Sequence, residues 1–151
     1  MNDDRALLLR IIGEGYERKA WHGPNLRTTL RGITPEQAAA RPAPERHNIW
    51  ELALHCAYWK FVAWRRISGS RGARFPRAGK NFFPTPAPTE AAWRDDLELL
   101  DESHHAFRDA VETLPARALA SNSRTIYGVA MHDVYHAGQI RLLARVLLLP
   151  T

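Results

Sequence analysis

Four long stretches of this sequence repeat apolar residues with the period of an α-helix, and none shows the strict apolar–polar alternation of a half-buried strand. They cover about residues 3–20, 48–68, 89–114 and 123–149. Each amphipathic helix can bury its apolar stripe only against the others. We therefore predict an all-α fold, a four-helix bundle. The connections of about 27 and about 20 residues between the first three helices are long enough to be crossover connections.

The apolar stripes identify a candidate core. The residues expected to face inward are Leu7, Leu8, Ile11 and Ile12 in the first stretch, Ile49, Leu52, Cys56, Trp59 and Ala63 in the second, Trp93, Leu97, Leu100, His104, Phe107, Val111 and Leu114 in the third, and Ile126, Val129, Ile140, Leu143 and Leu147 in the fourth. This is one continuous set of stripes, and 151 residues is the usual size of one domain. We expect residues 1–151 to form a single domain.

Several residues have the positions of helix start and stop signals. Asn48 and Thr89 precede the second and third stretches as N-caps, and Pro115 ends the third. Thr34 opens the segment "TPEQ", with proline at the first helical position and glutamine in the place of a capping box. A short additional helix is therefore predicted from Thr34.

Composition excludes several classes of protein. No apolar run approaches the roughly 18 residues needed to cross a bilayer, and the N-terminal "MNDDRALLLRII" opens with acids where a signal peptide carries bases. Cys56 is the single cysteine and has no partner for an internal disulfide. We expect a cytoplasmic protein that does not enter membranes.

The formal net charge is +5, and one stretch without acids contains Arg65, Arg66, Arg71, Arg74, Arg77 and Lys80. Most of this stretch lies in the segment "SGSRGARFPRAGKNFFPTPAP". Exposed arginines are ordinary in a loop of this composition, and the segment lacks a nucleic-acid docking motif. Nucleic-acid binding is therefore disfavoured. The charge alone suggests that these arginines attract the carboxylates of a small ligand.

Two histidines interrupt the apolar stripe of the last stretch. In "MHDVYHAGQIRLL", His132 and His136 lie one helical turn apart on the face of Ile140, while His55 lies one turn from both Leu52 and Trp59. Imidazoles buried on core-facing stripes need polar partners, and a divalent metal would satisfy all three. The alternative is a set of ordinary core histidines with separate hydrogen-bond partners. The residue pattern alone leaves both interpretations open.

If the site binds metal, three imidazoles would leave a coordination position for water or substrate, as in catalytic zinc sites. Zinc is the first expectation, with nickel, iron and manganese as alternatives.

The segments "HNIWELALHCAYWK", "GVAMHDVYHAGQIRLL" and "WHGPNLRTTLRGITPEQAAARPAP" together resemble the DinB/YfiT-like superfamily of metal-binding four-helix bundles. The similarity covers nearly the whole chain. It implies that His55, His132 and His136 hold a divalent metal. The "WHG" turn corresponds to Trp21–Gly23, which implies that His22 lies near the mouth of the metal pocket.

The resemblance also implies candidate activities. Characterised relatives include S-transferases that use mycothiol, bacillithiol or glutathione and an isomerase that uses a low-molecular-weight thiol, while others are called hydrolases without a known substrate. An open metal site can activate either a thiol or water. The alternative is a non-catalytic metal-binding or protein-interaction bundle. The resemblance further implies a homodimer acting on a small molecule.

Other residues near the three histidines have candidate roles. Gln139 is expected either to orient a water or substrate or to serve in packing. Asp133 and Glu51 either hold the second nitrogen of a ligand imidazole or are surface acids. His104 is expected to be a polar residue at the end of the core rather than a fourth ligand or a general base. Cys56 is expected to be a buried thiol that points away from the metal.

Overall fold

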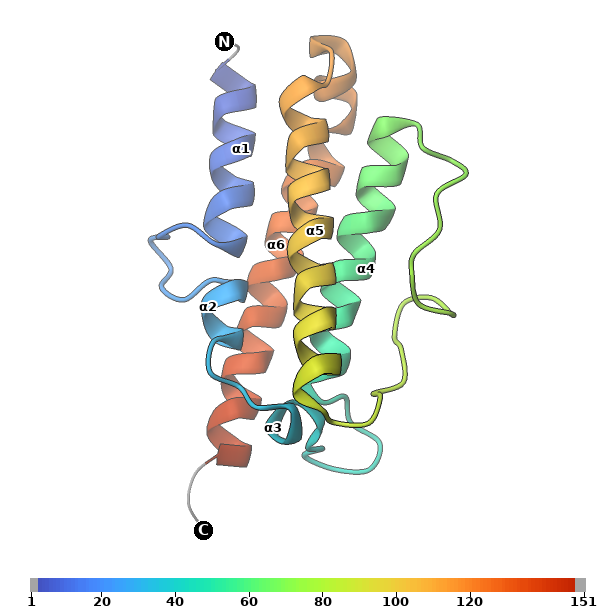
Figure 1. Ribbon diagram of the computed structural model, residues 1–151. Helices are drawn as coiled ribbons and strands as arrows, with labels where there is room; N and C mark the ends of the chain where they lie inside the picture. Colours follow the sequence, from blue (N-terminus) through green and yellow to red (C-terminus); the bar gives the residue numbers. More distant parts are fainter. Residues whose placement is uncertain (1–2, 149–151) are drawn as a thin grey trace.

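The computed structural model describes residues 3–148, which form six helices and, within that range, no β-strand. These are α1 (Asp3–Tyr16), α2 (Leu26–Leu30), α3 (Pro35–Ala39), α4 (Ile49–Ser68), α5 (Glu90–Thr113) and α6 (Ala116–Leu148). The four long helices lie side by side as a bundle (Figure 1). The predicted all-α fold is confirmed.

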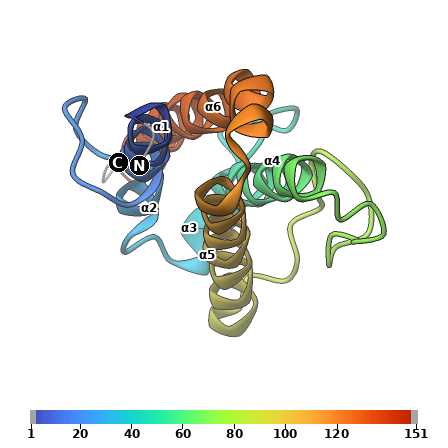
Figure 2. The same ribbon diagram turned by 90° about the horizontal axis from the view of Figure 1, so that it is seen from above.

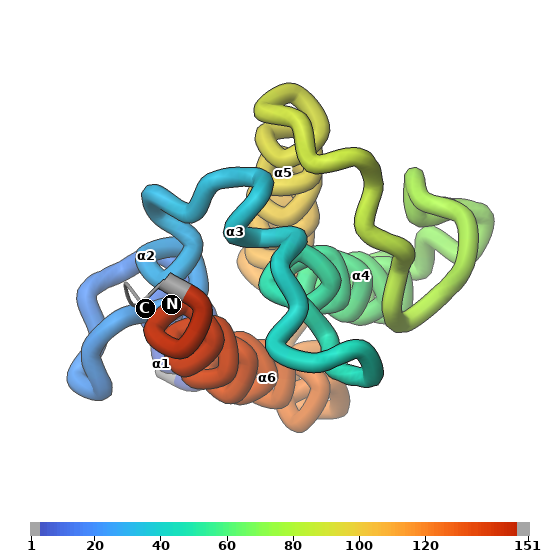
Figure 3. Tube along the Cα trace, turned by 90° about the horizontal axis from the view of Figure 1, so that it is seen from below, coloured from blue at the N-terminus to red at the C-terminus, as the bar shows by residue number. Residues whose placement is uncertain are grey.

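The long helices are not joined in simple up-and-down order. In Figure 1, α4 and α5 both run upward, while α1 and α6 run downward. The loop over residues 69–89, which connects α4 to α5, therefore returns along the length of the bundle, as the predicted crossover requires (Figure 2). The connection with α2 and α3 crosses the end of the bundle where α6 ends (Figure 3).

The predicted caps of three helices are present. The Asn48 side chain accepts a hydrogen bond from the Glu51 backbone N–H at 2.8 Å, and Thr89 does the same for Ala92 at 3.2 Å. Thr34 begins α3 with the predicted capping box and Pro35 at the first position. Gly69 ends α4 in the left-handed conformation, with φ of 73°.

The first helix is shorter than predicted, because α1 ends at Tyr16 and not at Ala20. The carbonyl of Gly13 accepts from the N–H groups of both Glu17 and Arg18, which closes the last turn. The Asn25 side chain then donates to the Arg18 carbonyl at 2.8 Å. This contact holds the chain away from the helix axis.

Two further boundaries differ from the prediction. α6 begins at Ala116, not near Ser123, because the Pro115 carbonyl accepts the first helical hydrogen bond from Leu119. Its predicted end at Leu149 lies outside the described residues. The sequence analysis also missed α2, where Asn25 and Thr28 form a reciprocal capping box.

The core is divided into two apolar clusters. One surrounds Trp50 and Leu100, and the other surrounds Ile12 and Phe107. Between them, α4, α5 and α6 contribute the buried polar residues Lys60, His104 and Asp133. Most predicted core positions are buried, but Leu7 is 50% exposed and Trp59 is 40% exposed. These two residues were wrongly assigned to the core, and Trp59 instead lines a groove described below.

Among residues 3–148, no helix combines the length and apolar character needed to span a membrane.

Candidate metal centre

Three imidazoles from two helices meet at one point. His55 lies on α4, and His132 and His136 lie on α6, which runs antiparallel to α4 (Figure 1). The Nε2 atom of His132 lies 3.0 Å from Nε2 of His55 and 3.1 Å from Nε2 of His136. His55 and His136 are buried and His132 is partly buried. The structure therefore brings together the three histidines that the sequence singled out.

These distances fit a shared cation. Three nitrogens placed about 2.0–2.1 Å from one tetrahedral ion would lie about 3.3 Å from each other. The 3.0 Å and 3.1 Å separations are close to that geometry, and one ligand atom from each ring lies within 4.8 Å of the others. The chemistry of the donors also fits, since neutral imidazole is a common ligand for divalent metals.

The crossover loop orients His55. Its Nδ1–H donates a hydrogen bond to the Asn81 carbonyl at 3.0 Å. The lone pair of Nε2 is therefore free to coordinate a cation. Phe82 stacks on the ring, with centroids 4.2 Å apart. Asn81 has a φ of 70°, a left-handed conformation that asparagine tolerates better than most residues. The sequence analysis missed both residues, although the pair of aromatics in "NFF" within a polar loop was a signal that the loop is anchored to the bundle.

Gln139 orients His136 in the same way. The Nδ1–H of His136 donates to Oε1 of Gln139 at 2.6 Å, and the Gln139 amide donates in turn to the Tyr135 hydroxyl at 3.3 Å. The carbonyl end of the amide therefore fixes which ring nitrogen faces the other imidazoles. The structure places Gln139 against a candidate ligand, and its contact with water or substrate stays a prediction.

The three rings are held in the neutral state that binds metals. Burial, reinforced by neighbouring histidines and opposed by the hydrogen bond to Asn81, lowers the pKa of His55 to about 4. Burial and the two adjacent imidazoles lower the pKa of His132 to about 3. Burial also lowers the pKa of His136, against the hydrogen bond to Gln139. All three lone pairs are therefore available at neutral pH.

The two acids considered as partners of the ligand rings are engaged elsewhere. Asp133 forms a fully buried ion pair with Lys60, and Glu51 pairs with Arg41 and His47. Within residues 3–148, Nδ1 of His132 has no hydrogen-bond partner. Neither interpretation of these acids is met: both are buried and so are not surface acids, and Asn81 and Gln139 hold two of the rings instead.

Cys56 is a fully buried thiol, as predicted, but it lies nearer the site than its helical offset suggested. Its sulfur, one nitrogen of His132 and one oxygen of Asp133 lie within 4.8 Å of one another. Burial raises the pKa of the Cys56 thiol well above its usual value, with a further rise from Asp133. In the metal-free protein this thiol is therefore protonated.

His104 belongs to the interior, not to the cluster of three. Its ring is 0% exposed, stacks on Tyr16 at 4.0 Å, and lies with Nδ1 3.5 Å from the Lys60 ammonium. The sequence analysis placed His104 at the end of the core, whereas it lies in the polar layer between the two apolar clusters. It contacts none of the three candidate ligands.

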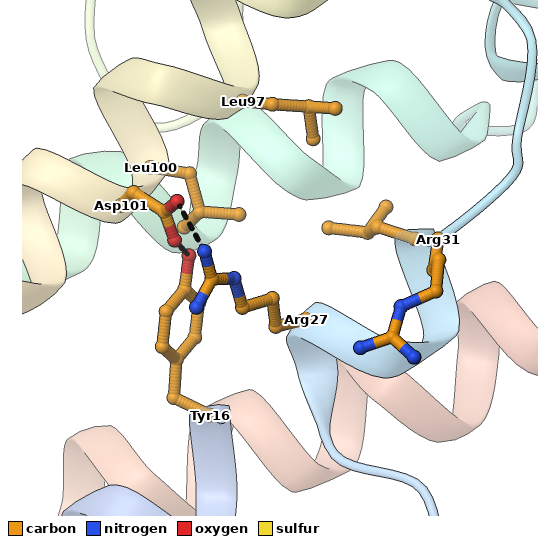
Figure 4. A pocket seen from close by; sticks show the side chains of 7 residues that line it. Tyr16, Arg27, Arg31, Leu97, Leu100 and Asp101 are labelled. Carbon is orange, nitrogen blue, oxygen red and sulfur yellow. Dashed lines mark hydrogen bonds and ion pairs between the residues drawn. The ribbon is translucent and has the colours of Figure 1, made fainter. Parts of the chain in front are cut away.

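Several cavities lie on the surface of the described part of the bundle. A groove of about 240 Å³ between α4 and α6 reaches His132 and Trp59. His22 is exposed in a separate cavity with Met131 and Tyr135, so its role at the metal pocket stays a prediction. A third cavity, of about 440 Å³, contains neither histidine nor cysteine and includes Tyr16 and Asp101, whose side chains are hydrogen-bonded (Figure 4).

The loop arginines were expected to attract a ligand carboxylate. Arg77 instead forms an ion pair with the buried Asp96 of α5. This contact anchors the crossover loop to the bundle.

The family model of the DinB superfamily matches residues 20–140, which include all three histidines. The chain belongs to the DinB superfamily. No curated protein and no solved structure matches it. The match confirms the resemblance seen in the sequence, and the residues that the DinB resemblance implied as ligands are those that converge in the structure.

Proposed function

We propose that this protein is a divalent-metal-dependent enzyme in which His55, His132 and His136 hold the ion. The observation that supports this is the convergence of three Nε2 atoms, with separations of 3.0 Å and 3.1 Å, while two of the opposite nitrogens are held by Asn81 and Gln139. Zinc is the first expectation because it favours histidine ligands in tetrahedral sites, and nickel, iron and manganese are alternatives.

Three protein ligands leave a position open to a small molecule. When bound, the ion lowers the pKa of a low-molecular-weight thiol or of water and so supplies a nucleophile near neutral pH. The protein contributes fixed ring orientations through Asn81 and Gln139, and a groove that reaches His132 from solvent. We propose either transfer of a thiol sulfur to an electrophile or hydrolysis as the reaction.

The metal assignment is tested by replacing each histidine with alanine. We expect wild-type protein to bind one equivalent of zinc, and each of His55→Ala, His132→Ala and His136→Ala to lose most of it. His105→Ala is the matched control, because His105 is half exposed and lies on α5 outside the cluster. Stoichiometric metal in all three variants would refute the assignment.

The activity is tested with metal-loaded protein. Mycothiol, bacillithiol and glutathione are supplied with electrophilic acceptors, and ester and amide substrates are supplied without a thiol. Thiol consumption that depends on His132 would support a transferase, and thiol-independent turnover would support a hydrolase. Absence of both would favour the non-catalytic alternative.

One observation favours a role in protein interaction beside the enzyme. Four large apolar side chains on α6 are each 59–64% exposed and share one face of the helix: Met131, Tyr135, Leu142 and Val146. Exposed apolar stripes of this kind mark interaction surfaces. We propose that this face forms a homodimer. Light scattering should give a dimer for wild-type protein and a monomer for Leu142→Glu/Val146→Glu.

A further inference from the structure

The groove that reaches His132 is built from one face of each of two helices. Trp59, Val62, Ala63 and Arg66 follow the helical repeat on α4, and Thr125, Gly128, Val129 and His132 follow it on α6. The helices α4 and α6 are antiparallel (Figure 1). Trp59 and His132 therefore lie toward one end of the groove, and Arg66 and Thr125 toward the other. The groove therefore begins at the candidate metal centre and leads away from it.

The middle of this groove is apolar and open. Ala63 and Val129 belong to a buried core cluster and form part of its wall. A β-carbon built on Gly128 would meet no atom within 4 Å, so the missing side chain leaves free space. Trp59 is fixed at the inner end, because its indole N–H donates to the Asn81 side chain at 3.0 Å. These features suit an apolar segment of a ligand.

The outer end of the groove is positively charged. Arg66 is exposed, and within residues 3–148 it forms no ion pair, while no acidic residue lines the groove. The Thr125 hydroxyl provides a second polar group at this end. An anionic group is therefore the complement of this end.

We infer that the groove binds the substrate of the proposed enzyme, and that this substrate has an apolar body ending in an anionic group. The inference rests on the proposed function for the reacting end of the molecule. Trp59 and Arg66 are seven positions apart on one helix, which corresponds to about 10 Å at 1.5 Å per residue. The groove volume of about 240 Å³ is slightly below the usual range for drug-sized ligands and suits a small molecule. The substrate thus places its reacting group at His132 and its anionic group at Arg66.

The test measures the binding of octane-1-sulfonate by calorimetry. Metal-free protein is used so that the sulfonate group cannot coordinate a metal ion. We expect octane-1-sulfonate to bind at least about fivefold more tightly than octan-1-ol, which lacks the charge. Gly128→Leu should weaken binding about tenfold or more, because the new side chain fills the groove. Gly138→Leu is the matched control: Gly138 is also in α6, also has open space at its β-carbon, and does not line the groove.

A second pair of variants tests the charged end. Arg66→Gln should weaken sulfonate binding about two- to fivefold, as expected for an exposed ion pair, and should leave octanol binding unchanged. Arg65→Gln removes the same charge from a neighbouring residue that lines a different cavity, and should match wild type. Because Trp59 lines the groove, sulfonate binding should change the tryptophan fluorescence of the wild-type protein. Trp59→Phe should remove this change.

Several results would overturn the inference. Equal sulfonate affinity in wild type and Gly128→Leu, or equal losses in Gly128→Leu and Gly138→Leu, would place the probe outside the groove. Sulfonate binding that changes with the oligomeric state of the protein would instead indicate that a second copy of the chain covers the groove. Circular dichroism and metal content of each variant identify misfolding. Because the probe is measured without metal, its outcome is independent of the histidine variants that test the proposed function.

Discussion

The ammonium of Lys60 and the carboxylate of Asp133 form an ion pair in the middle of the bundle, with both side chains only 1% exposed. Lys60 lies on α4 and Asp133 follows His132 directly on α6. The Lys60 ammonium also lies over the Tyr16 ring, 4.7 Å from its centroid. The pair therefore ties together the two helices that carry the candidate ligands.

Removing one member of this pair should be costly. Lys60→Met leaves the Asp133 carboxylate buried without its cation, and we expect the free energy of unfolding to fall by about 3–5 kcal/mol. Lys60→Met/Asp133→Leu should recover most of this loss, because neither charge remains. The control is Arg94→Met, which breaks an exposed pair with Glu98 and should change stability by less than about 0.5 kcal/mol. Urea unfolding checks all three, and a double variant as unstable as Lys60→Met would contradict the account.

Gln139 is predicted to act through His136. Gln139→Leu removes the acceptor of the His136 Nδ1–H and should weaken zinc affinity about 10–100-fold, as found for groups that orient metal ligands. Gln139→Glu keeps an acceptor oxygen and should retain affinity within a few-fold of wild type. Competition with a chelator measures both. Equal affinity in Gln139→Leu and wild type would show that the hydrogen bond has no effect on the site.

His104 should make the metal-free protein sensitive to acid. Burial and the Lys60 ammonium lower its pKa to about 2, and they outweigh the Glu17 carboxylate 3.7 Å from Nε2. The unfolded chain takes up this proton near pH 6.5 and the folded chain does not, so stability present above about pH 6.5 is lost as the pH falls. From this group alone we expect a loss of about 2 kcal/mol between about pH 7 and pH 5.

The variant His104→Gln isolates that contribution. Its stability should fall less than that of wild type over the same pH range. Asp133 acts in the opposite direction, since burial raises its pKa to about 6, but it is common to both proteins. Urea unfolding at each pH gives the comparison. The same pH dependence in His104→Gln and wild type would contradict a buried neutral ring.

Gly15 is predicted to set the contact between α1 and α6. A β-carbon at this position would lie 3.0 Å from the Ala130 carbonyl oxygen, which is backbone and gives way poorly. Gly15→Ala should therefore destabilise the protein by about 1–3 kcal/mol. Gly138→Ala has open space and should be neutral or stabilising by up to about 1 kcal/mol. Thermal unfolding ranks the two, and a reversed order would contradict the close approach.

The sequence was sufficient to predict the helical bundle from spacing along each helix, whereas the three histidine ligands were implied by the resemblance to the DinB/YfiT-like superfamily. The caps at Asn48, Thr34 and Thr89 were also local signals and were confirmed. The end of α1 was not predictable in this way, since it depends on the contact between Asn25 and Arg18. Local pattern predicts a structure only where tertiary contacts do not override it.

The environment of the histidines was largely beyond the sequence analysis. Lys60 and Asp133 are 73 residues apart, and their pairing follows from how α4 and α6 pack. Asn81 reaches His55 from a loop whose path no periodicity describes. Trp59 was assigned to the core because of its apolar character, although it borders the groove. Helical spacing and the family resemblance identified the candidate ligands on α4 and α6, whereas contacts between elements determined what surrounds them.

The most direct test of a metal site at the three imidazoles is X-ray absorption on the zinc-loaded protein. The account predicts three imidazole nitrogens about 2.0–2.1 Å from the zinc and one further light atom from a small molecule. A sulfur neighbour at about 2.3 Å, or fewer than three imidazoles in the wild-type protein, would contradict it.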